Sequence, residues 1–202
     1  IVASDGRPGE GAGPFVLRFD HGEIEEGPMG FMVEDRHLYR ALLAAMDAAA
    51  NVTLIDGDSV IAQEIGAGSG EVTLASGRRV RGRLVVGCDG RDSPTARRAG
   101  IRRHGWGYDQ TALVSAVRHE KPHEGVAHQF FMPGGPLAIL PLPGNRSSIV
   151  WSEESAAAAG IAALPDPVYL EMLRPRFGSF LGEIALEGAR FTYPLKLSLA
   201  ER

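Results

Sequence analysis

The sequence predicts an α/β fold joined to a second module that is dominated by an antiparallel sheet. Before Trp106, a strong helix pattern, several β-hairpin patterns and a short helix alternate along the chain. After Trp106, four strand patterns follow one another at short intervals. Alternating helices and strands are typical of an α/β layout, whereas consecutive short strands are typical of a separate sheet. The 202 residues are 44% hydrophobic, which is enough for a core in one large domain or two small ones.

The first quarter of the chain contains one strand pattern and one helix pattern. Apolar and polar residues alternate over Phe15–Asp20, as expected for a half-buried strand. A helix is predicted to begin at Asp35, which can cap it, and to carry Leu38 and Leu42 at helical spacing. Asn51 suits the C-terminal end of this helix.

A run of β signals follows the helix. Three short apolar stretches are separated by glycine-containing turns, at Val52–Ile55, Ser59–Ile65 and Glu71–Ala75. A further strand is predicted at Val80–Gly87, and it ends in the continuous apolar run Leu84-Val85-Val86. Such a run predicts a strand that is covered on both faces, as in a parallel sheet.

A tight turn and a short helix come next. Ser93 is a good N-cap, Pro94 suits the first helical position, and Gly100 ends the helix predicted at Thr95–Ala99. Backbone N–H groups in such a turn can bind a phosphate or a ribityl hydroxyl, and Asp89 can accept a hydrogen bond from a sugar hydroxyl. The same spacing also fits an ordinary strand–helix connection in which the aspartate and serine satisfy backbone donors.

The second half of the chain predicts an antiparallel meander, a helix and a last strand. The four strand patterns lie at Thr111–Arg118, Val126–Phe131, Leu137–Leu142 and Ser147–Ser152. A helix is predicted to begin at Asp166-Pro167 and to bend at Pro175. Phe191–Leu199 has the pattern of the last strand.

Composition excludes several classes of protein. A net charge of −4 argues against a dedicated nucleic-acid binder. The single cysteine, Cys88, excludes an internal disulfide framework and a CxxC site, and we expect it to be a small buried apolar residue. No apolar run approaches the roughly 18 residues of a membrane span, and no signal peptide opens the chain. We therefore expect a soluble protein of a reducing compartment.

Two residue clusters have an ordinary explanation. His119, His123 and His128 could suggest a metal site, but Pro122 interrupts them and no helical i, i+4 spacing is available, so we expect no metal. Nine arginines between Arg78 and Arg103 suit phosphate contacts, yet the chain uses arginine throughout, so a solvated surface is the expected role. No nucleophile elbow, Walker loop or HExxH motif is present, and we predict no catalytic side chain.

Three motifs resemble FAD-dependent aromatic hydroxylases similar to p-hydroxybenzoate hydroxylase. Leu84–Ser93 resembles the Asp-Gly motif of that family, and Gly30–Arg36 resembles a second family motif just ahead of a helix. Gly135–Leu142, followed by Ser147–Ser152 and preceded by Pro122-His123-Glu124-Gly125, is similar to the ubiquinone-biosynthesis branch, which hydroxylates polyprenylated phenols. The resemblance covers nearly the whole chain, and the last motif is much more specific than the first.

The resemblance implies a Rossmann-like FAD domain interleaved with a mostly antiparallel substrate domain. Residues 1–33 would be the first piece of the substrate domain, and 34–104 a segment of the FAD domain. Residues 105–190 would form the main substrate sheet, and 191–202 would return to the FAD domain.

The resemblance also implies cofactor contacts. Arg36 matches a residue that contacts the ribityl–pyrophosphate region of the flavin. Asp89 and Gly90 match residues that touch the flavin and are implicated in binding the nicotinamide cofactor, and Ser93 matches the serine of the motif. The family's arginine stands three residues after that serine, whereas this chain has Arg97 one position later.

Leu140 and Leu142 stand where the family places substrate contacts, on one face of a strand. The implied substrates are a polyprenyl phenol and O2, with FAD as cofactor and NAD(P)H as co-substrate. The cofactor would carry the chemistry, and the protein would orient the substrate and exclude water.

The remaining family motifs, an N-terminal G-x-G-x-x-G and a later Gly-Asp-Ala, would lie outside Ile1–Arg202. The resemblance therefore implies a central fragment of a monooxygenase, itself inactive and holding FAD weakly or not at all. Two alternatives stay open: a non-catalytic interaction or folding module without flavin, and an FAD hydroxylase of a different, soluble phenol. The expected location is the cytoplasm. Because the substrate class is hydrophobic, we also expect peripheral attachment to the inner membrane or to a biosynthetic complex.

Overall fold

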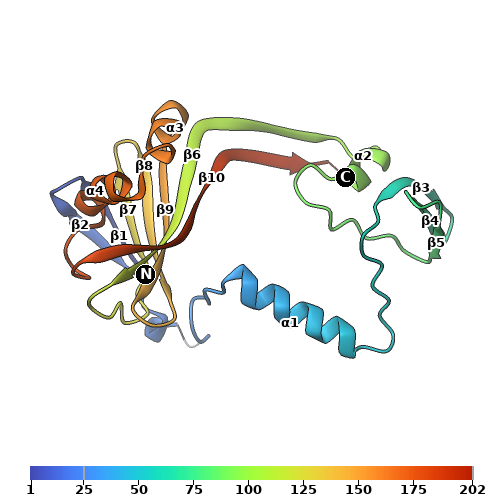
Figure 1. The fold of residues 1–202 in the computed structure, drawn as a ribbon, viewed down its shortest axis with the longest axis horizontal. Helices are drawn as coiled ribbons and strands as arrows, with labels where there is room; N and C mark the ends of the chain where they lie inside the picture. The colour runs from blue at the N-terminus through green and yellow to red at the C-terminus, as the bar shows by residue number, and fades with distance from the viewer. Residues whose placement is uncertain (25, 202) are drawn as a thin grey trace. The chain divides into compact units, whose positions relative to one another are not determined.

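The computed structural model describes residues 1–24 and 26–201, and it divides the chain into two compact units (Figure 1). Unit 1 contains Ile1–Glu34 and Gly107–Lys196. Unit 2 contains Asp35–Trp106 and the residues from Leu197 onward. Each unit is therefore assembled from two separate segments of the chain.

Unit 1 is built on a seven-stranded sheet with the strand order β10-β6-β9-β8-β7-β1-β2. Its strands are β1 (Val2–Arg7), β2 (Gly11–Arg18), β6 (Arg103–His119), β7 (His128–Met132), β8 (Gly135–Leu142), β9 (Arg146–Glu154) and β10 (Ile184–Ala200). The pairs β1–β2, β6–β9, β7–β8 and β8–β9 are antiparallel, and β1–β7 is parallel. A mixed α/β fold with a mainly antiparallel sheet is confirmed.

The predicted meander is wrong in one respect. β9, not β7, lies beside β6, so only β7, β8 and β9 follow one another as hairpin neighbours. The alternating side chains Ser147, Ile149 and Trp151 of β9 are all buried, which suits a central strand. Residues 120–127, between β6 and β7, can span up to about 26 Å, whereas crossing two strands takes only about 10–15 Å.

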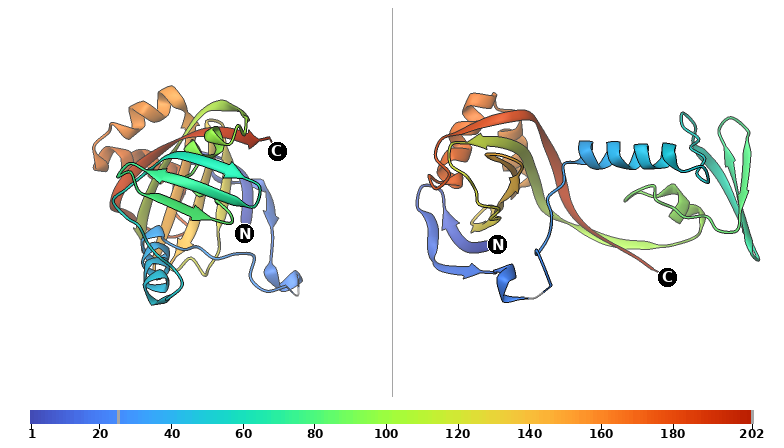
Figure 2. Two further views of the ribbon diagram at one scale, coloured as in Figure 1. Left: turned by 90° about the vertical axis from the view of Figure 1, so that its right-hand side faces the viewer. Right: turned by 90° about the horizontal axis from the view of Figure 1, so that it is seen from below.

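Helices α3 (Ser155–Ala162) and α4 (Asp166–Phe177) pack on one face of this sheet (Figure 2). Leu137, Ile139 and Trp151 from the strands meet Leu173 and Phe177 from α4 in a single buried cluster. α4 begins where it was predicted and contains Pro175 near its C-terminal end. The hydrophobic core of unit 1 is therefore formed by contacts within the unit.

Two elements of unit 1, β1 and α3, were not predicted from the sequence. β1 contains Ser4, Asp5 and Gly6, which do not alternate in polarity, and its place is set by pairing with β2 and β7. α3 is an alanine-rich run without an amphipathic pattern, and it buries Ala158 and Ile161. Tertiary contacts decide β1, whereas the alanine run favours the helix of α3 locally because alanine is the strongest helix former.

Unit 2 contains α1 (Asp35–Ala48), α2 (Pro94–Arg98) and a three-stranded antiparallel sheet with the order β3-β4-β5. The strands are β3 (Val60–Gly66), β4 (Ser69–Leu74) and β5 (Arg79–Gly82). The predicted helix from Asp35 and both hairpin strands are confirmed, although the helix ends at Ala48. Only Gly70, Leu74 and Ser93 are buried among the described residues of this unit.

Three expectations for unit 2 are wrong. Val52–Ile55 and Leu84–Val86 are not strands, and Leu84 and Val86 are 78% and 69% exposed. A strand needs a neighbour that accepts and donates backbone hydrogen bonds, and no described strand pairs with either run. Cys88, in the same stretch, is exposed rather than buried.

No helix among the described residues is long and apolar enough to cross a membrane.

Candidate functional site

The turn that leads from Gly87 to Ser93 is the first candidate site. Gly90 has a φ of +83°, a left-handed conformation that side chains disfavour. Ser93 caps α2, because its Oγ accepts a hydrogen bond from the N–H of Ala96 at 3.0 Å. The N-cap predicted from the sequence is confirmed.

Asp89 is held in this turn by two donors of the helix start. Its Oδ1 accepts a hydrogen bond from the Ser93 hydroxyl, and its Oδ2 accepts one from the Thr95 N–H at 2.9 Å. These bonds, the Ser93 hydroxyl above all, keep the pKa of the carboxyl far below its ordinary value. Asp89 is therefore an ionised carboxylate at neutral pH, and each oxygen keeps a lone pair for another donor.

The charge of Asp89 decides which ligand group suits the turn. An anionic carboxylate repels a phosphate but accepts a hydrogen bond from a hydroxyl. A Cβ built at Gly90 meets nothing within 4 Å, so a ligand can approach the backbone there. The five-residue α2 adds little dipole. The donors and acceptors present fit a ribityl-like hydroxyl better than a pyrophosphate.

The two candidate arginines lie in different elements. Arg97 is in α2, and its Nη1 donates a hydrogen bond to the carbonyl of Asp92 at 3.0 Å, which keeps the guanidinium at the turn. Arg36 is the second residue of α1, and it is exposed. The structure thus brings Asp89, Gly90, Ser93 and Arg97 together in one turn, with Arg36 in a separate helix.

A pocket of about 450 Å³ lies behind the turn, between the hairpin strands and α2. Gln63 lines it, donating from Nε2 to the Thr95 carbonyl at 3.1 Å, while its Oε1 is buried without a hydrogen-bond partner. A Cβ at Gly87 would lie 2.8 Å from Thr95 Cγ2, so glycine lets this segment approach α2. Gln63 was not predicted as a site residue, although it is a polar residue within the alternating pattern of β3.

Leu140 and Leu142 lie on the face of the unit 1 sheet opposite to α3 and α4. Both are on β8, with Leu140 beside Ser148 and Leu142 beside Arg146 of β9. Leu142 is buried and Leu140 is half-buried. Neighbouring positions on this face carry further small apolar side chains, namely Val114, Ala116, Ala138 and Val150. The face offers an apolar surface of the kind that binds an aromatic ring.

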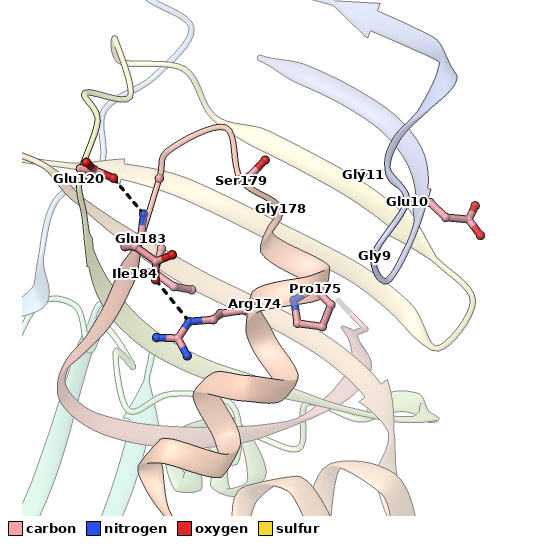
Figure 3. A pocket seen from close by; sticks show the side chains of 11 residues that line it. Gly9, Glu10, Gly11, Glu120, Arg174, Pro175, Gly178, Ser179, Glu183 and Ile184 are labelled. Atoms are coloured by element: carbon pink, nitrogen blue, oxygen red, sulfur yellow. Dashed lines mark hydrogen bonds and ion pairs between the residues drawn. The ribbon is translucent and has the colours of Figure 1, made fainter.

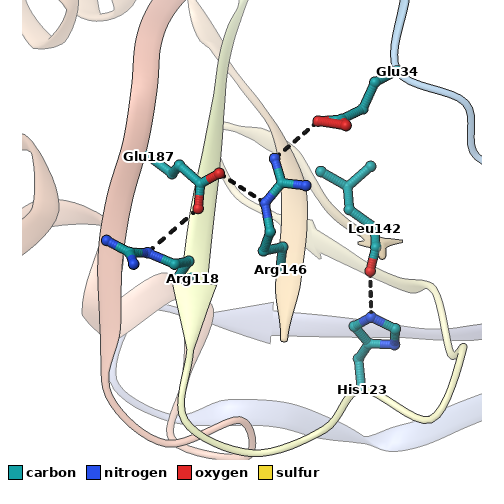
Figure 4. A network of polar contacts seen from close by, with 6 residues as sticks. All are labelled: Glu34, Arg118, His123, Leu142, Arg146 and Glu187. Atoms are coloured by element: carbon teal, nitrogen blue, oxygen red, sulfur yellow. Dashed lines mark hydrogen bonds and ion pairs between the residues drawn. The ribbon is translucent and has the colours of Figure 1, made fainter. Parts of the chain in front are cut away.

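An ion-pair network lies at the end of that face (Figure 4). Arg146 Nη2 donates to Glu34 Oε1 at 2.9 Å. Arg146 Nε lies 2.8 Å from Glu187 Oε1 as an ion pair without hydrogen-bond geometry, and Glu187 also faces Arg118 at 3.4 Å. The Glu34 hydrogen bond raises the pKa of Arg146, in spite of the opposing effect of burial. None of these four residues was predicted from the sequence as a site residue, although Glu34 lies within the Gly30–Arg36 motif.

The three histidines have protein partners. His119 contacts the Lys121 carbonyl through Nδ1 at 2.7 Å and the Ser147 hydroxyl through Nε2 at 3.0 Å. His123 accepts from the Gly125 N–H at Nδ1, so its Nε2 donates to the Leu142 carbonyl at 2.8 Å (Figure 4). Burial lowers the pKa of His128. Among the described residues, no group of three or more His, Cys, Asp or Glu is placed to hold a metal ion.

A larger pocket, of about 570 Å³, opens beside α4 in unit 1 (Figure 3). Its charged lining consists of Glu10, Glu120, Glu183 and Arg174, and Arg174 lies 3.8 Å from Glu183. The rest of the lining is largely glycine, which has no side chain to pack against an aromatic ring. This pocket therefore does not suit the substrate class that the resemblance implies.

Comparison with known proteins identifies relatives of this chain. No protein-family model matches it. The ubiquinone hydroxylase UbiL of Rhodospirillum rubrum is 43% identical over 193 residues, which cover 96% of this chain and 45% of that protein. The 3-demethoxyubiquinol 3-hydroxylase of Escherichia coli K12 is 37% identical over 138 residues, which cover 68% of this chain and 35% of that protein.

The chain is homologous to the ubiquinone hydroxylases. The resemblance stated from the three motifs is confirmed, and the homologous region spans less than half the length of either relative. The flavin-dependent monooxygenase PieE, solved in complex with FAD and substrate, superposes with a TM-score of 0.59 at 15% identity over 84% of this chain and 31% of that one. This likeness establishes that the fold is shared with a flavin-dependent enzyme.

Proposed function

We propose that this chain is part of an FAD-dependent hydroxylase that acts on a polyprenylated phenol in ubiquinone biosynthesis. The observation that carries the proposal is the 43% identity to a ubiquinone hydroxylase over 96% of the chain. The Asp89 turn supports it independently, because its ionised carboxylate and open glycine suit a hydroxyl-rich ligand.

Each predicted cofactor residue has a role in this proposal. Asp89 accepts hydrogen bonds from ribityl hydroxyls, Gly90 permits close approach, and Ser93 holds the carboxylate in place. Arg97 and Arg36 supply positive charge for the phosphate groups. When bound, FAD supplies the oxygen chemistry, with NAD(P)H as the electron donor and O2 as the oxidant.

The apolar face around Leu140 and Leu142 is the proposed substrate surface. The half-buried Leu140 and its half-buried apolar neighbours would pack against the phenol ring and keep water away from it. Because a polyprenyl substrate partitions into lipid, we also propose a cytoplasmic location with peripheral attachment to the inner membrane.

The test is to purify the full-length protein that carries this chain and to follow NAD(P)H oxidation. We expect short-chain polyprenyl phenols to stimulate oxidation and to be hydroxylated, whereas small hydroxybenzoates should do neither. Stimulation by the small phenols alone would replace the ubiquinone substrate with a soluble one.

One observation favours a second candidate, a non-catalytic module without flavin. Both oxygens of Asp89 already accept hydrogen bonds from the start of α2, as in an ordinary turn that only caps a helix. A full-length protein that shows no flavin absorbance after purification and reconstitution with FAD would favour this module.

The 202-residue chain by itself is expected to hold FAD weakly or not at all. The two further flavin motifs that the resemblance implies, a G-x-G-x-x-G phosphate loop and a later Gly-Asp-Ala, do not occur within Ile1–Arg202. A visible spectrum of the purified chain tests this expectation, and a stoichiometric yellow flavin band would contradict it.

A further inference from the structure

Gln63 links the sheet of unit 2 to the first turn of α2. Its Nε2 donates a hydrogen bond to the carbonyl of Thr95 at 3.1 Å, from the middle of β3 to the second residue of the helix. At the last turn of α2, Arg98 Nη2 donates to the Val60 carbonyl at 2.5 Å. α2 has only five residues, and so short a helix depends on tertiary contacts for its position. The amide of Gln63 is the contact that holds the start of this helix to the sheet.

The backbone does not need this hydrogen bond. The Thr95 carbonyl already accepts a hydrogen bond from the Ala99 N–H at 3.0 Å, as in a regular helical turn. The other end of the Gln63 amide, Oε1, is buried and has no hydrogen-bond partner among the described residues, which lowers stability. An apolar side chain of similar length, such as methionine, would avoid that loss. The amide is therefore best explained by the position that it gives to Thr95.

Thr95 is one of the residues that orient the Asp89 carboxylate. The Thr95 N–H donates to Asp89 Oδ2 at 2.9 Å, while the Ser93 hydroxyl donates to Oδ1. Thr95 Cγ2 also lies against the backbone of Gly87, where a Cβ would come within 2.8 Å of it. A carboxylate held by donors on both oxygens has few orientations, and each oxygen presents its remaining lone pair in a fixed direction. Movement of Thr95 would therefore turn the carboxylate.

We propose that Gln63 is a positioning residue that fixes Thr95 to β3 and so fixes the direction in which the Asp89 carboxylate meets a ligand hydroxyl. The effect passes through two hydrogen bonds, from Gln63 Nε2 to the Thr95 carbonyl and from the Thr95 N–H to Asp89 Oδ2. Where it concerns FAD, the proposal rests on the proposed function. The link from Gln63 to Asp89 itself stands on contacts within unit 2.

The experiment uses the full-length protein and the variants Gln63→Met and Gln63→Leu, which both remove the amide without adding charge. Ser76→Ala is the matched control, because Ser76 lies in the turn between β4 and β5 of the same sheet and its hydroxyl donates to Asp58 Oδ2 at 2.5 Å. Three readouts are recorded: hydrogen exchange of the Thr95 amide, the Kd for FAD, and the visible circular dichroism of bound FAD. The Tm of each FAD-free variant is measured alongside.

We expect Gln63→Met to accelerate exchange of the Thr95 amide about tenfold and to raise the Kd for FAD about tenfold. The circular dichroism of bound FAD should change, because the flavin would meet an acceptor that points elsewhere. The Tm should stay within about 2 °C, since the lost hydrogen bond is offset by removal of a buried oxygen without a partner. Gln63→Leu should behave in the same way. Ser76→Ala should lower the Tm and leave the three readouts unchanged.

A double variant tests whether Gln63 acts through Asp89. In the background of Asp89→Ala the oriented carboxylate is gone, so addition of Gln63→Met should change the Kd for FAD by less than about twofold. A further tenfold increase would show that the two residues act independently and would overturn the proposed transmission.

Two other results would overturn the proposal. Unchanged exchange of the Thr95 amide in both Gln63 variants would show that the side-chain amide does not fix this residue. Faster exchange with unchanged FAD affinity and circular dichroism would show that the position of Thr95 does not matter to the ligand. If the unmodified protein binds no FAD, the proposed function fails, whereas the exchange readout still decides whether Gln63 fixes Thr95.

Discussion

Unit 1 and unit 2 differ in how completely their apolar side chains are buried. Unit 1 buries Trp151, Tyr169 and Phe177 among strands and helices of the same unit. Unit 2 leaves Leu84 and Val86 exposed, and only three of its described residues are buried. The difference shows that an apolar run does not by itself create a buried strand, because the strand also needs neighbours with which to pair.

The largest expected effect comes from deleting a core side chain of unit 1. Phe177 is 0% exposed, so Phe177→Ala should destabilise the chain by about 3–5 kcal/mol through lost burial and a cavity. Leu84→Ala in unit 2 is the control and should cost no more than about 0.5 kcal/mol. Urea denaturation measures both. Equal losses of stability in the two variants would mean that Phe177 and Leu84 do not differ in how tightly they are packed.

Replacing a glycine tests how closely a loop of unit 1 packs against its neighbours. Gly182 has a φ of +76°, and a Cβ there would lie 2.8 Å from Glu120 Cβ. We expect Gly182→Ala to cost about 1–3 kcal/mol, from strain and the collision together. Gly188 has a φ of +77° with nothing within 4 Å, so Gly188→Ala reports the strain alone and should cost less. Thermal denaturation of each variant measures the loss of stability. A larger loss for Gly188→Ala than for Gly182→Ala would contradict the close packing of the loop at Gly182.

A third prediction concerns Ser93, one of the few buried residues of unit 2. Ser93→Ala removes both the N-cap of α2 and a donor to Asp89, and should cost about 1 kcal/mol of local stability. Native-state hydrogen exchange of the α2 amides is the measurement. Ser93→Thr keeps a hydroxyl and serves as the control. Unchanged protection in Ser93→Ala would show that the turn does not depend on its cap.

The smallest expected effect is a pH dependence of the same turn. The pKa of Asp89 is lower in the folded state than in the unfolded chain, so the contribution of its carboxylate is complete above the unfolded pKa of about 4. That contribution decreases as the pH falls from about 4 toward the lower folded pKa. An NMR titration of the α2 amides should show this loss, and Asp89→Asn should abolish the dependence. A midpoint at or above pH 4 in the folded protein would contradict the assigned hydrogen bonds.

Local patterns predicted the elements whose contacts are local. The helix from Asp35, the hairpin strands and the cap at Ser93 all depend on neighbouring residues, and the sequence was sufficient for them. β1 and the order of β6 and β9 depend on pairing with distant strands, which spacing along the chain does not encode.

The residues of the candidate site also divide into those that are close in the sequence and those whose partners are distant. Asp89, Gly90, Ser93 and Arg97 lie within nine consecutive positions, and the motif predicted them as a group. Arg146 and Gln63 were missed because their partners, Glu34 and Thr95, are 112 and 32 positions away. The assignment of FAD contacts to Arg36 and to the turn, and of substrate contacts to Leu140 and Leu142, stays a prediction that the experiments above address.

The division of the chain has a consequence for how such proteins can change in evolution. The segments of unit 1 and unit 2 alternate along the chain, and β6 and β10 each run through a unit boundary. A single recombination breakpoint therefore cannot exchange one unit while leaving the other whole. New combinations would require coordinated crossovers inside paired strands, so the two units are expected to be inherited together and to diversify by point substitution rather than by shuffling.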